Sequence, residues 1–82
     1  MDEPRVTLYS RHGCHLCIDA GMLLDDMVGA DGYATVDIET DDDLLVRYEP
    51  RIPVIAIDGV DRLEAPIYGP DLARTLAEVD LL

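Results

Sequence analysis

The feature that most restricts how this chain can fold is the position of its only two cysteines, Cys14 and Cys17, between a strand pattern and a helix pattern. Residues 5–9 alternate between polar and apolar side chains, as a half-buried strand does. A polar turn at residues 10–13 separates them from a helix pattern that ends at Gly29, a residue suited to a C-terminal cap. The apolar stripe of this helix is expected to consist of Leu16, Ala20, Leu23, Leu24 and Met27. Both cysteines are therefore expected at the start of a helix that follows a strand.

The middle of the chain predicts a second strand and a second helix. Residues 33–38 alternate as a strand does, and Thr40 follows as the expected N-cap of a helix. The aspartates at 41–43 favour the positive end of the helix macrodipole, although such an acidic run could alternatively dock a partner or hold a metal. The short helix continues through Tyr48 and stops before Pro50.

The last third of the chain predicts a β-hairpin followed by a helix. Residues 53–57 form the third expected strand, and Asp58-Gly59 is a strong signal for a two-residue hairpin turn. The fourth strand is expected over residues 62–66, where the final proline favours a sheet edge or a strand end. Residues 69–71 (Gly-Pro-Asp) open a helix, with proline in its first turn. The apolar face of this helix consists of Leu72, Leu76 and Val79.

The order of these elements predicts an α/β fold of the type β-α-β-α-β-β-α. The opening strand, helix and strand imply a right-handed parallel crossover, and the later hairpin makes the four-stranded sheet mixed. Helices are expected to flank the sheet on both faces. With 82 residues and no internal linker, residues 1–82 are expected to form a single domain.

The charge of the chain restricts its partners. Its net charge is −12, and all six of its basic residues are arginines. Such a charge repels phosphate backbones and anionic lipid surfaces, so we expect neither nucleic acid nor a membrane as partner. The acidity either keeps a small monomer in solution or steers a partner protein that carries a basic patch. The acidic start of the chain lacks the basic and apolar regions of a secretory signal, which predicts a cytoplasmic protein.

The spacing of the cysteines favours chemistry over structure, because a bridge this local closes almost no loop and adds little stability. The arrangement Cys-x-x-Cys after a strand and at the start of a helix is typical of a thioredoxin-like redox centre. Free backbone N–H groups and the helix dipole favour a thiolate at Cys14, whereas Cys17 lies one turn further on and deeper. Cys14 is therefore predicted to attack a substrate disulfide, and Cys17 to resolve the mixed disulfide.

Two other interpretations of the cysteines exist. They could be inert core residues, or they could bind zinc together with His12 and His15. Four ligands within six residues strain tetrahedral geometry, so no metal is expected. His15 follows the nucleophile directly, and a protonated imidazole there would favour the thiolate; the alternative is an exposed histidine with little effect.

Three segments resemble the glutaredoxins, and most closely the short bacterial glutaredoxin-like proteins of the thioredoxin fold. Residues 8–17 (Leu-Tyr-Ser-Arg-His-Gly-Cys-His-Leu-Cys) resemble the active-site strand and loop of the family. Residues 51–54 (Arg-Ile-Pro-Val) resemble its cis-proline segment, and residues 67–71 (Ile-Tyr-Gly-Pro-Asp) an altered glycine-glycine-aspartate segment. The resemblance covers nearly the whole chain in the right order.

The resemblance implies roles for residues outside the cysteine pair. Arg11 matches a basic residue that contacts a carboxylate of glutathione, and Asp71 an acidic residue that meets its amine. Ile52 matches the residue whose backbone pairs with the bound thiol peptide, and the Ile52–Pro53 bond is expected to be cis. Gly69 matches the remaining member of the glycine pair.

The differences from the family predict weak binding of glutathione. Leu16 stands where an aromatic residue is usual, Tyr68 replaces a glycine, and Pro70 lacks a backbone N–H. The predicted protein is a dithiol thiol–disulfide oxidoreductase without a tightly bound cofactor, acting on disulfide-containing proteins. A reduced small thiol or a protein reductase would donate its electrons. The alternative is a non-enzymatic module that docks to a partner or bridges an iron–sulfur cluster through Cys14 and an external thiol.

Overall fold

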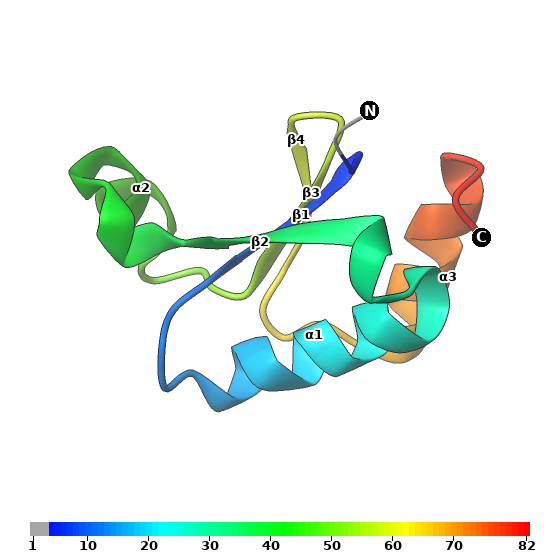
Figure 1. Ribbon diagram of the computed structural model, residues 1–82, viewed down its shortest axis with the longest axis horizontal. Coiled ribbons are helices and arrows are strands. Elements are labelled where there is room, and N and C mark those ends of the chain that lie inside the picture. Colours follow the sequence, from blue (N-terminus) through cyan, green and yellow to red (C-terminus); the bar gives the residue numbers. More distant parts are fainter. Residues whose placement is uncertain (1–3) are drawn as a thin grey trace.

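A computed structural model describes residues 4–82 of the chain (Figure 1). The acidic start at Met1–Glu3, on which the expectation of a cytoplasmic protein depends, lies outside the described residues. The predicted order of strands and helices is confirmed. Short 3₁₀ helices at Ala30–Gly32 and Ile38–Thr40 flank the second strand. The main elements are β1 (Val6–Ser10), α1 (His15–Val28), β2 (Tyr33–Asp37), α2 (Asp42–Tyr48), β3 (Val54–Ile57), β4 (Val60–Glu64) and α3 (Gly69–Glu78).

The four strands form one mixed sheet in the order β2-β1-β3-β4, which confirms the predicted fold class. β1 lies between β2, which runs parallel to it, and β3, which runs antiparallel. The parallel pair is joined by α1, as a β-α-β crossover requires. β4 pairs only with β3 and forms one edge of the sheet.

One face of the sheet packs against α1 and α3, which lie together below and to the right of the sheet in Figure 1. Alternate residues of β1 and β3 point to this face because side chains of a strand have a period of two. The cluster is fully apolar and forms the larger of two hydrophobic cores. Its buried members are Val6, Leu8, Ala20, Leu24, Ile55, Ile57, Leu72 and Leu76.

The opposite face packs against α2, so helices flank both faces as predicted. Ile38, Tyr48 and Val54 form this smaller buried core. The ring of Tyr48 stacks on that of Tyr9 with 4.2 Å between centroids, and its hydroxyl donates to Oδ1 of Asp61 at 3.0 Å. Burial of this phenol, followed by its bond to Asp61, raises the pKa of Tyr48.

The predicted hairpin turn is present at Asp58 and Gly59, whose φ angles of 54° and 82° lie in the left-handed region. Both residues adopt this region because a two-residue hairpin turn of type I′ demands it. Strand pairing resumes at once, with Val60 opposite Ile57. The fourth strand therefore spans Val60–Glu64, and the expected range of 62–66 was wrong by two residues.

Three further expectations were wrong. Asp41, not Thr40, caps α2, because Thr40 belongs to the preceding 3₁₀ helix and the Asp41 carboxylate accepts from the N–H of Asp43 at 2.8 Å. Ile38 leaves the second strand to begin that 3₁₀ helix. Leu16 is 52% exposed, because the buried face of α1 is centred on Cys17, Ala20 and Leu24.

The described residues contain no helix that is long and apolar enough to cross a bilayer.

The phenol of Tyr33 joins the start of β2 to α1. Its hydroxyl lies 2.7 Å from Oδ1 of Asp25 and 3.2 Å from the carbonyl oxygen of Gly21. Burial and the Asp25 carboxylate raise the pKa of Tyr33 from 10.0 to about 12. The folded state therefore holds this proton more tightly than the unfolded state, and the stabilisation is complete below pH 10.

We predict that the free energy of unfolding of the oxidised protein falls between pH 10 and about pH 12, as the unfolded state loses this proton first. The phenol is partly exposed and screened by solvent, so we expect a loss of about 1–2 kcal/mol. Tyr33→Phe should reduce the pH dependence, measured by urea unfolding at each pH. Tyr68→Phe, which removes an exposed phenol, is the control, and an unchanged pH dependence in Tyr33→Phe would contradict the prediction.

Candidate active site

One end of the sheet positions the candidate site. β1 ends at Ser10, which pairs with Asp37 at the end of the parallel strand β2. Tyr9 pairs with Val54 of the antiparallel strand β3, so Pro53 precedes that strand at the same end. Strand pairing thus places residues from three segments of the chain beside the loop that carries the cysteines.

The loop between β1 and α1 turns the chain so that Cys14 becomes the N-cap of the helix. Gly13 has a φ of 80°, which a residue without a side chain adopts at no steric cost. Cys14 is extended, and its N–H donates to the carbonyl oxygen of Arg11 at 3.3 Å. Its own carbonyl accepts from the N–H of Ile18 at 3.1 Å, the first hydrogen bond of α1. The expected position of Cys14 at the helix N-terminus is therefore confirmed.

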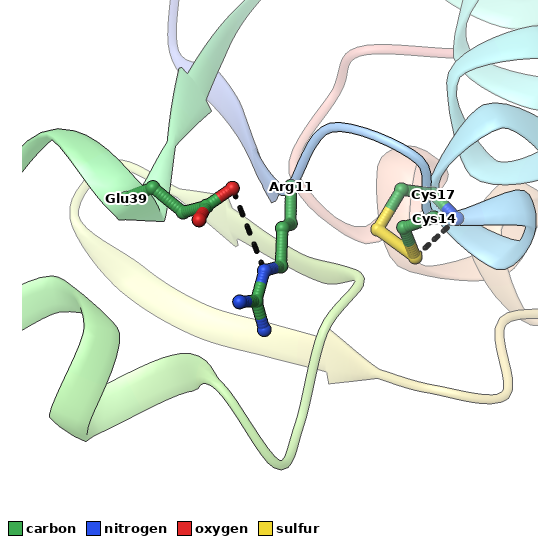
Figure 2. Close-up of a disulfide and its surroundings, with 4 residues drawn as sticks. All are labelled: Arg11, Cys14, Cys17 and Glu39. Atoms are coloured by element: carbon green, nitrogen blue, oxygen red, sulfur yellow. Dashed lines mark hydrogen bonds and ion pairs between the residues drawn. A yellow bond between two sulfur atoms is a disulfide. The ribbon is translucent and has the colours of Figure 1, made fainter.

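The two cysteines form a disulfide with 5.2 Å between their Cα atoms (Figure 2). Cys17 is only 4% exposed and belongs to the buried face of α1, whereas Cys14 is half-buried. The N–H of Cys17 donates to Sγ of Cys14 at 3.2 Å, so a helix N-terminal donor is directed at the outer sulfur. In the reduced protein the same donor would stabilise a thiolate on Cys14.

A pocket of about 480 Å³ lies beside the loop and is lined by residues of three elements. Its lining residues are Ser10, Arg11, His12, Gly13, Ile18 and Asp37. Nε of Arg11 lies 3.5 Å from Oε1 of Glu39, and Figure 2 shows the side chain directed away from the sulfur atoms. The side chain of Ile18 is 56% exposed, which gives the pocket an apolar wall.

The cis-proline segment directly precedes β3. The Ile52–Pro53 bond is cis, as expected, and Pro53 is buried. The N–H of Ile52 donates to the carbonyl oxygen of Tyr48 at 3.1 Å. A bound peptide would therefore have to displace this bond or pair through the Ile52 carbonyl. The Ala65–Pro66 bond is also cis, which was not predicted.

The other predicted residues are less closely associated with the disulfide. His15 is the exposed first residue of α1. Gly69 faces Leu23, a residue about two and a half turns of α1 beyond Cys14. The carboxylate of Asp71 accepts from Nη2 of Arg74 at 2.8 Å. Among the hydrogen bonds and ion pairs of residues 4–82, none joins these side chains to the cysteines.

Two residues near the site, Asp37 and Glu39, were not identified as site residues from the sequence. The side chain of Asp37 accepts from the N–H of Glu39 at 2.9 Å and caps the short 3₁₀ helix that carries Glu39. One sequence signal could have identified Asp37, because the carboxyl ends of adjacent parallel strands meet at the same edge of a sheet. Nothing in the local pattern distinguishes Glu39 from the other acidic residues.

A zinc ion would need further ligands beside the two sulfur atoms. Over the described range 4–82, no group of three or more histidine, cysteine or acidic side chains is arranged to hold a metal ion. The pair of sulfur atoms is instead arranged for exchange with another disulfide or thiol, with one sulfur approachable and the other buried behind it.

Solved structures similar to this chain are redox proteins and structural genomics targets. The protein XcR50 from X. campestris is 33% identical, with a TM-score of 0.78 over 89% of this chain and 96% of that one. Oxidised glutaredoxin 2 from Chlamydomonas reinhardtii is 23% identical, with a TM-score of 0.64 over 95% and 84% of the two chains. Protein Ne2328 from Nitrosomonas europaea is 20% identical, with a TM-score of 0.64 over 92% and 93%.

A complex of buckwheat glutaredoxin with glutathione shares the fold at 16% identity and a TM-score of 0.59, over 94% of this chain and 72% of that one. No curated protein matches the chain significantly. The family model of the glutaredoxin-like domain (DUF836) matches residues 5–77, which include both cysteines and the cis-proline. Together with the close cysteine pair, this match supports a thiol–disulfide redox role. The chain belongs to the family of glutaredoxin-like domains.

Proposed function

We propose that this protein is a dithiol thiol–disulfide oxidoreductase in which Cys14 is the nucleophile and Cys17 the resolving cysteine. The observation that carries the proposal is the hydrogen bond from the N–H of Cys17 to Sγ of Cys14, at the N-terminus of α1. It gives the two sulfur atoms different environments. The accessible one is stabilised as a thiolate, and the buried one is protected from substrates.

The reaction proceeds by two exchanges. The thiolate of reduced Cys14 attacks one sulfur of a substrate disulfide, forms a mixed disulfide and expels the other sulfur as a thiolate, which takes up a proton. Cys17 then loses its proton and attacks Sγ of Cys14. This attack releases the second substrate thiol and closes the Cys14–Cys17 disulfide. Two electrons pass from the protein to the substrate, and two thiol groups of a donor return them by the reverse exchanges.

The proposal extends to the setting in which the protein works. Residues 1–82 act as one domain and as a monomer in the cytoplasm, on protein disulfides, with a small thiol or a protein reductase as donor. The family match over residues 5–77 supports one functional unit. A reducing compartment fits a chain whose only cysteines are the exchanging pair.

Residues around the pair are proposed to bind the substrate. Pro53 and the carbonyl of Ile52 offer an edge to an extended peptide, and His15 flanks the nucleophile. Arg11 lines the adjacent pocket. Gly69 and Asp71 carry the binding role that the family resemblance gives them, although Asp71 is engaged by Arg74.

The first prediction from this mechanism concerns the reactivity of Cys14. We expect the pKa of its thiol in the reduced protein to lie below the value of about 8.5 for a free cysteine, because the helix N-terminus stabilises the thiolate. Alkylation with iodoacetamide across pH, followed by mass mapping, measures which cysteine reacts and at what pH. Faster alkylation of Cys17, or an ordinary titration of Cys14, would contradict the assigned roles.

The second prediction separates the roles of the two sulfurs. Cys14→Ser should abolish reduction of bis(2-hydroxyethyl) disulfide, because no attacking thiolate remains. Cys17→Ser should instead accumulate a mixed disulfide on Cys14, detectable as an added mass that dithiothreitol removes. The two variants are matched controls, because each removes one sulfur from the same turn. Accumulation of the adduct in Cys14→Ser, or unchanged turnover in both variants, would refute the mechanism.

The third prediction is weak binding of glutathione. Leu16 offers no aromatic face, Tyr68 occupies a glycine position, and Pro70 has no N–H to donate. Each lost hydrogen bond to a charged group costs about 1.5–3 kcal/mol, so affinity should fall about tenfold or more. Titration of reduced glutathione into Cys17→Ser, monitored by amide shifts near Ile52 and Asp71, measures it. Saturation of the shifts at micromolar concentrations would contradict the prediction.

A further inference from the structure

The arginine of the pocket beside the cysteine loop already forms an ion pair within the protein. Within residues 4–82, Arg11 is the one arginine that lines the pocket next to the cysteine loop, and Glu39 lies 3.5 Å from its Nε. Both side chains are partly exposed, at 39% and 45%, so a ligand could compete for either. An anionic substrate would have to draw Arg11 away from Glu39 before it gained an ion pair.

The carboxylate of Asp37 in the pocket is held in place by a hydrogen bond from the backbone. Asp37 lines the pocket at the end of β2, and its Oδ1 accepts from the N–H of Glu39 at 2.9 Å. Its carbonyl oxygen also accepts from the hydroxyl of Thr40 at 2.7 Å. These bonds hold Asp37 and Glu39 on one short turn, so two carboxylates accompany the single guanidinium of Arg11 and the local formal charge is negative.

The other five arginines of the chain do not line this pocket. Four further arginines have acidic partners within 4 Å in the described residues. Arg47 instead lies over the ring of Tyr48, 5.8 Å from its centroid on α2. The paired arginines are Arg5, Arg51, Arg62 and Arg74. With a net charge of −12, the molecule attracts cations in general, and this pocket lies beside the loop that leads to Cys14.

We infer that Asp37 and Glu39 are specificity-determining residues, and that the substrate disulfide lies in a protein segment whose neighbouring side chains are cationic. This inference rests on the proposed oxidoreductase function and names the class of its substrate. Glu39 acts in two ways, since it attracts a substrate lysine or arginine and keeps Arg11 from binding carboxylates. Anionic small thiols are disfavoured for the same reason.

The test compares disulfide-linked peptide dimers that differ only in the residues next to cysteine, which are lysine, glutamine or glutamate. Fully reduced protein is mixed with each peptide, and the peptide thiol released is measured after an acid quench. Each rate is divided by the rate of the same peptide with dithiothreitol, which removes the intrinsic reactivity of the disulfide. At about 0.1 M salt, where the Debye length is about 10 Å, we expect the lysine peptide to exceed the glutamate peptide about tenfold.

Two variants test whether the carboxylates of Asp37 and Glu39 cause this preference. Glu39→Gln removes a charge and releases Arg11, and Asp37→Asn removes a charge while retaining an amide oxygen that can cap the same turn. Each should reduce the lysine-to-glutamate ratio at least twofold. Asp31→Asn is the matched control, because Asp31 lies beyond the far end of α1, a helix of 14 residues and about 21 Å. It should leave the ratio unchanged, and about 1 M salt should bring the ratio close to one.

The outcomes separate this inference from the function on which it rests. Failure to reduce the glutamine peptide would overturn the oxidoreductase proposal itself. Reduction of that peptide with equal normalised rates for lysine and glutamate peptides would overturn only the substrate inference. The substrate inference would also be overturned if Asp31→Asn lowered the lysine-to-glutamate ratio as much as Glu39→Gln. It would be overturned likewise if Glu39→Gln and Asp37→Asn both left this ratio unaltered.

Discussion

The pairing of β1 with two neighbours of opposite direction is the constraint on which the site depends. Val6 and Leu8 bury one side of this central strand, so its register is fixed, because a shift by one residue would turn both side chains to the opposite face. Parallel pairing brings the end of β2 beside Ser10, and antiparallel pairing brings the start of β3 to the same place. The cysteine loop, the acidic turn and the cis-proline segment therefore meet at one end of the sheet.

The redox chemistry then depends on how α1 begins. A helix leaves its first N–H groups without partners, and here one of them is directed at Sγ of Cys14. The same helix directs Cys17 toward the core, where Ala20 and Leu24 continue the buried face. The orientation of α1 about its axis therefore leaves one sulfur atom accessible and the other buried. The same orientation of the helix exposes Leu16, two residues after the nucleophile.

Electrostatics distinguishes this site from one built to hold an anionic thiol. Arg11 occupies the position of a carboxylate-binding residue in the resemblance, yet Glu39 neutralises it and Asp37 adds a further negative charge to the pocket. A disulfide with cationic neighbours would meet no such penalty. Part of the acidity of the chain therefore lies beside the cysteine loop.

The sequence by itself determined the order of the elements, the hairpin turn at Asp58 and Gly59 and the position of Cys14 at a helix start, because each depends on local patterns of a few residues. The cis bond before Pro53 came from the family resemblance. Only the tertiary structure decided that Glu39 neutralises Arg11, since these residues lie far apart in the sequence and meet through the parallel pairing of β1 and β2. The exposure of Leu16 was also a tertiary result, because helix periodicity does not reveal which side of an apolar stripe the sheet covers.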